Sequence, residues 1–128
     1  MIWAILAVLG AYLLGSVSFA YFAGKAKGID LRQHGSGNLG ATNAGRVLGM
    51  RWFVIVFALD LAKGVVAVLV AKEVERRTGL SWTPIAAAAA VVLGHSFTCF
   101  HGFKGGKAVA TSLGVLAALV WKVAVVCL

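Results

Sequence analysis

Residues 2–22 read IWAILAVLGAYLLGSVSFAYF, a stretch without a single charged side chain. About 20 residues of this kind, folded as a helix, are long enough to cross the roughly 30 Å hydrocarbon core of a bilayer. No Lys or Arg precedes the stretch, it is about twice as long as the apolar region of a signal peptide, and it has no clear cleavage site of the A-x-A type. We therefore expect it to remain in the protein as a transmembrane helix.

The composition of the whole chain favours a membrane protein with several such helices. Of its 128 residues, 61% are hydrophobic and only 12% are charged. Soluble domains have roughly 25% charged residues, so a soluble fold is excluded. The sequence predicts an all-α, polytopic integral membrane protein, a single transmembrane domain over residues 1–128 with about four transmembrane helices, at about residues 2–23, 52–71, 83–100 and 108–128. Cys99 and Cys127 lie in apolar surroundings, which excludes a disulfide framework and makes them buried small side chains.

The net charge of +8, from 12 Lys and Arg against 4 Asp and Glu, belongs mostly to the loops. A nucleic-acid-binding protein would need a large solvated basic face, which so apolar a chain does not offer. The first and third loops hold seven Lys and Arg: Lys25, Lys27, Arg32, Arg46, Arg51, Lys104 and Lys107. The second loop holds three: Lys72, Arg76 and Arg77. Because Lys and Arg are enriched in cytoplasmic loops, we expect the first and third loops to be cytoplasmic and the N-terminus to be outside.

The first loop contains a glycine-rich segment, GSGNLGATN at residues 35–43, followed by Arg46. Closely spaced glycines let successive backbone N–H groups point into one concavity, which suits a phosphate, and an Arg adds a forked donor. A flexible surface linker is the alternative, but the amides, the Arg and a second loop of this kind on the same face favour an anion site. The candidate residues of this segment are Gly35, Ser36, Gly37, Asn38, Gly40, Thr42, Asn43 and Arg46.

The third loop, within GHSFTCFHGFKGGK at residues 94–107, is also rich in glycine and lysine. It is not a Walker A motif, because it is one residue short and has Ala108 where Ser or Thr would bind magnesium. What remains is a glycine-rich backbone, two Lys charges and a helix start near Ala108 whose N–H groups favour an anion. The alternative is that the two lysines are stop-transfer charges, which mark the end of a membrane span and bind no ligand. The candidate residues here are Gly102, Lys104, Gly105, Gly106, Lys107 and Thr111.

Four ionisable residues lie within the predicted spans or at their ends. Asp60 and Lys63 have the i,i+3 spacing that brings side chains together on one helix face, and we interpret them as a structural pair in preference to a functional site. His95 and His101 lack the acidic or thiolate companions of a zinc site, so no metal is expected. His95 is either a hydrogen-bonding residue or one that orients substrate or transfers a proton.

Four segments carry a family resemblance: Gly15-Ser16, GSGNLGATNAGR at residues 35–46, LDLAKG at residues 59–64 and GHSFTCFHGFKGGKAVAT at residues 94–111. In this order, over nearly the whole chain, they resemble the bacterial acyl-phosphate:glycerol-3-phosphate acyltransferases, the PlsY family. The resemblance implies a seven-span enzyme of the bacterial inner membrane without a metal or nucleotide cofactor. The implied reaction transfers an acyl group from acyl phosphate to the sn-1 hydroxyl of glycerol 3-phosphate and yields lysophosphatidic acid for phospholipid synthesis.

Matched residue by residue, the resemblance places the family's essential Ser and Arg on Ser36 and Arg46. Its phosphate loop falls on residues 102–107, with Lys104 as a charged substrate ligand. His95 is the candidate base in a matching motif, and the substrate phosphate is the alternative proton acceptor. We expect Ser36, Arg46, His95 and Lys104 to be catalytic and the other candidates to bind substrate. The expected partners are glycerol 3-phosphate, acyl phosphate and membrane lipid, with no cofactor, no nucleic acid and no obligate protein partner.

The sequence departs from the family's usual pattern at several positions. Ser18 and Ala20 replace a Pro and a Gly in the first span, Thr98 replaces a Pro, and Ala108 replaces a Gly. The family's last three spans, with a motif of His, Asn and Glu, have no counterpart in these 128 residues, which we expect to have little or no turnover alone. The alternatives are an inactive truncated paralogue and a non-catalytic membrane protein that binds or transports phosphoesters.

Overall fold

Six α-helices and one short 3-10 helix form the structure, a computed structural model that describes residues 1–126 and all their side chains except those of residues 122–124. In chain order they are α1 (Ile2–Ser16), α2 (Phe19–Ala26), η1 (Leu31–Gln33), α3 (Ala41–Leu48), α4 (Met50–Thr78), α5 (Thr83–Ser96) and α6 (Val109–Val126). Within the described residues there is no β-strand. This confirms the prediction of an all-α fold.

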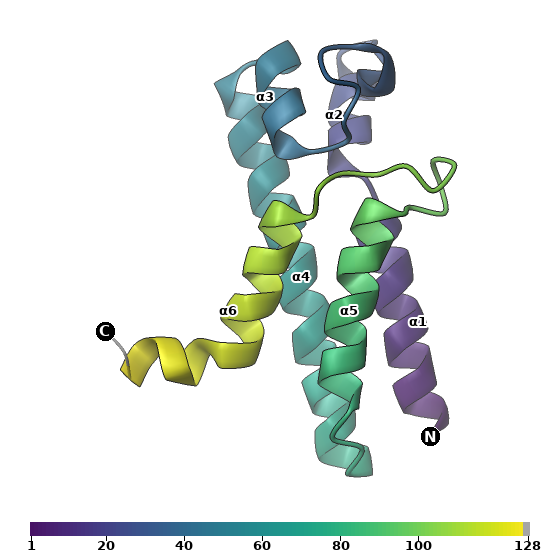
Figure 1. The fold of residues 1–128 in the computed structure, drawn as a ribbon, viewed down its shortest axis with the longest axis vertical. Helices are drawn as coiled ribbons and strands as arrows, with labels where there is room; N and C mark the ends of the chain where they lie inside the picture. Colours follow the sequence, from purple (N-terminus) through teal and green to yellow (C-terminus); the bar gives the residue numbers. More distant parts are fainter. Residues whose placement is uncertain (127–128) are drawn as a thin grey trace.

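The long helix α4 is the centre of the bundle. It contacts each of the other α-helices in the described part of the chain, and Figure 1 shows α1, α5 and α6 arranged around its length. The stretch Ile2–Ala26 and α4 have the length and hydropathy of membrane-crossing helices, and Thr83–Ser96 and Val109–Trp121 are shorter apolar helices. The apolar core between them consists mainly of small side chains, among them Ala67, Val68 and Val91.

Glycines allow the helices to approach one another closely. Gly15 on α1 and Gly94 on α5 each lie against a backbone carbonyl of the facing helix, and a Cβ atom at either position would overlap that carbonyl. Gly64 on α4 and Gly114 on α6 make the same kind of contact with each other's helix. Because small residues let helix backbones pack closely in a membrane, these two pairs set the spacing of α1 against α5 and of α4 against α6.

The first predicted span is not one continuous helix. α1 ends at Ser16, Val17 has extended backbone angles, and Ser18 caps α2 by accepting a hydrogen bond from the backbone N–H of Tyr21. The carbonyls freed by the break are bonded from elsewhere: Lys63 Nζ donates to Gly15 and Val17 at 3.0 and 2.9 Å. Thr98 Oγ1 donates to the Ser16 carbonyl at 2.6 Å. The break therefore forms without the usual Pro at position 18.

The other predicted spans also differ from the helices in their limits. α4 continues to Thr78, through most of the segment predicted as the second loop, and α5 already ends at Ser96. α6 has a kink at Val120, whose backbone angles are not helical. Lys72 on α4 donates a 2.6 Å hydrogen bond to the carbonyl of Ala118, next to this kink. The predicted end of the last span at residue 128 and the predicted burial of Cys127 lie outside the described residues.

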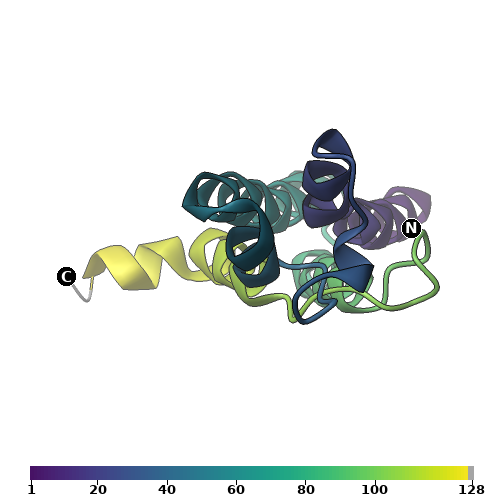
Figure 2. The ribbon, with the colours of Figure 1, turned by 90° about the horizontal axis from the view of Figure 1, so that it is seen from above.

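Both glycine-rich loops lie at one end of the bundle. In Figure 1 the segment between α2 and α3 and the loop between α5 and α6 occupy the upper end, opposite the N-terminus and the α4–α5 turn. Figure 2, which looks onto that end, shows the two loops together and the last part of α6 turned away from the other helices. The structure thus brings together the two loops that the sequence analysis singled out.

We expect Gly94→Ala to lower the free energy of unfolding by about 1–3 kcal/mol, because its Cβ atom forces α1 and α5 apart. The matched control is Gly10→Ala in α1, where a Cβ atom meets no atom within 4 Å. Alanine favours a helix over glycine by about 1 kcal/mol, so this control is expected to be neutral or stabilising. Thermal unfolding in detergent measures both, and equal effects would contradict the packing argument.

Replacing the buried ammonium with an apolar side chain, Lys63→Met, is expected to cost about 3–5 kcal/mol of unfolding free energy, because it leaves a buried charge without a partner. The same substitution at exposed Lys27, whose ammonium lies over the Trp52 ring, should cost at most about 1 kcal/mol. Unfolding in detergent is again the measurement. A Lys63→Met variant as stable as Lys27→Met would show that the break in α1 does not need the ammonium.

Candidate active site

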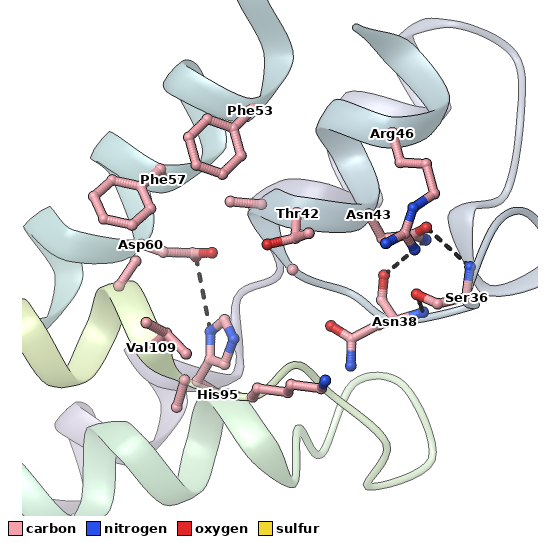
Figure 3. A pocket seen from close by; sticks show the side chains of 15 residues that line it. Ser36, Asn38, Thr42, Asn43, Arg46, Phe53, Phe57, Asp60, His95 and Val109 are labelled. Atoms are coloured by element: carbon pink, nitrogen blue, oxygen red, sulfur yellow. Dashed lines mark hydrogen bonds and ion pairs between the residues drawn. The ribbon is translucent and has the colours of Figure 1, made fainter. Parts of the chain in front are cut away.

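A cavity of about 450 Å³ lies where both glycine-rich loops meet the ends of α3, α5 and α6 and the side of α4. Figure 3 shows the side chains that line it. Eight of the predicted site residues are among them: Ser36, Asn38, Gly40, Thr42, Asn43, Arg46, His95 and Lys107. The sequence analysis did not name the other lining residues as site residues: Ala41, Phe53, Phe57, Asp60, Ala108, Val109 and Ala110.

Asn43 holds the first loop in its shape. The residue is 1% exposed. Its Nδ2 donates to the carbonyls of His34 and Asn38, both at 3.1 Å, and its Oδ1 accepts from the N–H of Ser36 at 3.0 Å. Gly35 is needed beside it, because φ is +57° there and a Cβ atom would overlap Asn43 Oδ1. Asn43 was predicted to bind substrate, but its side-chain amide forms hydrogen bonds that hold the backbone of Ser36 and Asn38 in place.

The glycines of the third loop act differently from the prediction. The N–H groups of Gly105 and Gly106 donate to the carbonyls of Ser96 and His95, at 2.9 and 3.1 Å, and so cap the C-terminal end of α5. These two amides are therefore engaged within the protein and do not face an anion. Gly106 also lies so close to His95 that a Cβ atom would overlap Nε2 of the imidazole. The loop consequently fixes the position of His95.

The cationic side chains of the two loops separate into two groups. Arg46 and Lys107 are exposed and line the cavity, and in the described part of the chain neither is paired with a carboxylate. Lys104, predicted to be a substrate ligand, is exposed but does not line the cavity, and the same holds for Gly102. Gly35, Gly37, Gly105, Gly106 and Thr111 are also absent from the lining.

His95 and Asp60 form the inner wall of the cavity. His95 Nδ1 lies 3.8 Å from Asp60 Oδ1 and 3.4 Å from the hydroxyl of Thr111, which is fully buried behind the ring. Asp60 in turn forms a 3.0 Å ion pair with Lys63. The predicted pairing of Asp60 and Lys63 is present, but Asp60 also faces the cavity, which the sequence analysis did not anticipate.

Two aromatic side chains on α4, Phe53 and Phe57, complete the wall above Asp60 (Figure 3). Residues 53, 57 and 60 have the i, i+4, i+7 spacing of one helix face. This spacing was visible in the sequence, but nothing in the sequence shows which face of α4 meets the loops.

Ala108 directly precedes α6 and has a strained backbone conformation. Its φ is +58°, in the left-handed region where a side chain is unfavourable by roughly 1–2 kcal/mol, and it is only 3% exposed. A glycine at this position would avoid that cost. Ala108 lines the cavity, so its methyl group occupies space next to the predicted anion site.

His101 lies apart from His95 and joins the two loops. The centre of its ring lies 4.3 Å from that of Tyr21 on α2. The Arg32 guanidinium lies 5.2 Å from the centre of the same Tyr21 ring. Partial burial and then the charge of Arg32 lower the pKa of His101. Arg32 is bonded to Asp30, and this hydrogen bond lowers the pKa of the Asp30 carboxyl to about 2. Among the described residues, no three His, Cys, Asp or Glu side chains gather in a group that could hold a metal ion.

Comparison with known proteins gives consistent matches. The family described as "Glycerol-3-phosphate acyltransferase" matches residues 5–128. The glycerol-3-phosphate acyltransferases of Halalkalibacterium halodurans and Aquifex aeolicus are 53% and 49% identical, over 90% and 91% of this chain and 56% and 59% of their own. The chain therefore spans somewhat more than half the length of these relatives.

Two solved structures have the same fold. Both are described as PlsY (YgiH), an integral membrane glycerol 3-phosphate acyltransferase, in a glycerol 3-phosphate form and a lysophosphatidic acid form. Their TM-scores are 0.85 and 0.82 at 48% and 46% identity, and each match covers 96% of this chain and 60% of the other. With its apolar helices, glycine-rich loops and matched motifs, this chain is a polytopic membrane protein that belongs to the glycerol-3-phosphate acyltransferase family.

Proposed function

We propose that the cavity is the site where an acyl group passes from acyl phosphate to the sn-1 hydroxyl of glycerol 3-phosphate, which yields lysophosphatidic acid. The observation that carries this proposal is the placement of Arg46 and Lys107, from different loops, on one cavity without acidic partners in the described residues. Both substrates have a phosphate group, and two cations without acidic partners in the described residues, at one cavity, suit such a group. Family membership supports the same reaction.

The proposed reaction forms one bond to the acyl carbon, breaks another, and transfers the hydroxyl proton to the released phosphate, directly or through a proton acceptor. The sn-1 hydroxyl oxygen attacks the acyl carbon, the bond from that carbon to the phosphate oxygen breaks, and inorganic phosphate leaves. The acyl group is already activated, so the site mainly has to orient the hydroxyl and stabilise negative charge on phosphate and on the carbonyl oxygen. No bound cofactor takes part in this scheme.

The residues have distinct proposed roles. Arg46 and Lys107 hold phosphate charge, and the hydroxyls of Ser36 and Thr42 and the amide of Asn38 donate hydrogen bonds. Of the two lysines of the third loop, this geometry favours Lys107 over Lys104 for direct contact. Phe53 and Phe57 offer an apolar surface to the acyl chain of a donor that enters from membrane lipid, and His95 is the proposed proton acceptor.

The proposed location is the bacterial inner membrane, with both loops cytoplasmic and the N-terminus outside. In a variant without the native cysteines, a membrane-impermeant thiol reagent applied outside the cell should label Ser81→Cys, in the α4–α5 turn, and spare Gln33→Cys, in the first loop. Both positions are exposed, so accessibility differs only by side of the membrane. Labelling of Gln33→Cys alone would reverse the proposed orientation.

For phosphate binding, we expect Arg46→Ala and Lys107→Ala each to weaken the binding of glycerol 3-phosphate by about 10- to 150-fold. This range corresponds to the loss of a charged hydrogen bond of about 1.5–3 kcal/mol. Arg51→Ala, at an exposed position outside the cavity lining, is the matched control and should leave the affinity unchanged. Titration calorimetry in detergent measures the affinities.

Acyl transfer from palmitoyl phosphate separates the proposed enzyme from the alternatives. Product formation that Arg46→Ala reduces would support the proposal. Binding of glycerol 3-phosphate without product agrees with the low turnover expected of residues 1–128 alone. The same result in a chain extended to the seven spans that the resemblance implies would favour the non-catalytic phosphoester-binding alternative or the inactive paralogue. Affinity that neither Arg46→Ala nor Lys107→Ala changes would remove both residues from the site.

A further inference from the structure

A groove lies at the end of the bundle opposite the glycine-rich loops, between the first turn of α1 and the last turns of α4. Its volume is about 710 Å³, which is within the range of ligand-binding pockets. It shares no lining residue with the candidate active site, and Figure 1 shows the N-terminus and the α4–α5 turn at this end. The proposed acyl transfer gives this groove no role.

The polarity of the groove changes along the axis of α4. Leu69, Val70 and Val74 form its apolar part, and Glu73 and Arg77 add charge toward the end of the helix. Positions 69, 73 and 77 have the i, i+4, i+8 spacing of one helix face, and about 10 Å of helix separates position 70 from position 77. The groove is therefore amphipathic, with its apolar part toward the middle of the membrane and its charged part toward the surface.

The apolar part of the groove lies on the outside of the bundle. Leu69 and Val70 are 53% and 52% exposed, and Trp3, which lines the groove from α1, is 66% exposed. In a membrane protein such side chains contact lipid rather than water. Tryptophan is enriched at the level of the lipid headgroups, which agrees with the position of Trp3 in the first turn of α1. This surface offers apolar contacts to an acyl chain.

Arg77 has hydrogen-bond donors that the protein does not use. Glu73 accepts from Nε and Nη2 of Arg76, at 2.9 and 2.7 Å, but from Arg77 it accepts through Nε alone, at 2.6 Å. Within the described residues, the two terminal nitrogens of Arg77 have no hydrogen bond. Of the two arginines, Arg77 lines the groove and Arg76 does not. A guanidinium with free N–H groups is well suited to bind a phosphate.

The charge at this end of α4 favours an anionic ligand. Three cations, Lys72, Arg76 and Arg77, face two carboxylates, Glu73 and Glu75, so the net charge is 3 − 2 = +1. The helix dipoles add little to this balance, because the positive end of α1 lies beside the negative end of α4. A headgroup with a net charge of −1 complements the cluster, whereas a zwitterionic headgroup brings another cation toward the arginines.

We infer that this groove binds one molecule of an anionic membrane phospholipid. The phosphate accepts hydrogen bonds from the Arg77 guanidinium, and one acyl chain lies along Leu69 and Val70, beside the Trp3 ring. The inference concerns the end of the molecule away from the proposed acyl transfer and does not depend on that function. A second copy of the chain fits this face less well, because a symmetric contact brings two positively charged clusters together.

Native mass spectrometry of the purified chain tests the binding. In a detergent that preserves bound lipid, titration with phosphatidylglycerol should saturate one tight site, and phosphatidylcholine with the same acyl chains should bind that site more weakly. Equal affinities for the two lipids would overturn the inference. A dimer that excludes phosphatidylglycerol would also overturn it and would assign the groove to a contact between copies.

Arg77→Gln tests the phosphate contact. We expect this variant to bind phosphatidylglycerol about 10-fold more weakly, which corresponds to the loss of a charged hydrogen bond at an exposed site. The matched control is Arg51→Gln, at an exposed position near the other end of α4 that lines neither the groove nor the candidate active site. Equal losses in both variants would show that the lipid responds only to overall charge, and the inference would be wrong.

Val70→Trp tests the acyl-chain contact by filling the apolar part of the groove. Its control is Val66→Trp, about one turn away on α4, where Val66 is 48% exposed and does not line the groove. Both positions are outside the core, so both variants should fold. We expect Val70→Trp alone to weaken the binding of phosphatidylglycerol, and unchanged binding in Val70→Trp would contradict the inference.

Glycerol 3-phosphate titration separates this inference from the proposed function. Arg77→Gln and Val70→Trp should bind glycerol 3-phosphate as the wild type does, because both substitutions lie at the opposite end of the bundle. A wild-type chain that binds phosphatidylglycerol at one site but does not bind glycerol 3-phosphate would count against the proposed function and support the lipid groove. The reverse result would support the proposed function and overturn the lipid groove.

Discussion

The rest of the structure depends on the ion pair and the two hydrogen bonds that the buried Lys63 ammonium makes. It joins Asp60 on its own helix to the carbonyls of Gly15 and Val17 at the break between α1 and α2. A break in an apolar helix exposes polar backbone groups that lipid cannot satisfy, and this ammonium, with Thr98, satisfies them. The break lets α2 leave the direction of α1, so that the first loop lies over the end of the bundle.

The two loops are shaped by contacts that do not involve Arg46 or Lys107. Asn43 fixes the first loop through its own amide, and the third loop is fixed because Gly105 and Gly106 cap α5. Neither arrangement uses Arg46 or Lys107, which remain directed to the cavity they line. Glycine therefore serves here mainly to allow close approach of backbones, and the positive charge of the cavity comes from side chains.

Three residues that the sequence analysis described as departures from the resembled pattern each take part in the backbone arrangement. Ser18 caps α2 where a Pro is usual, Thr98 bonds to the Ser16 carbonyl, and Ala108 adopts the left-handed conformation that suits a Gly. The first two replacements supply hydrogen bonds that a Pro does not. The third retains a local strain of roughly 1–2 kcal/mol, which the surrounding close packing of Ala108 has to offset.

The sequence by itself determined that the chain is helical and apolar, and it identified both loops and most of the cavity residues, because hydropathy and glycine spacing are local properties. It also paired Asp60 with Lys63 from their spacing on a helix. Only the tertiary structure decided that Lys63 caps a break in another helix, that Lys107 rather than Lys104 lines the cavity, and that Asp60 faces His95. These facts depend on how α4 is rotated and which backbone groups α1 and α5 present to it, and no local pattern encodes either.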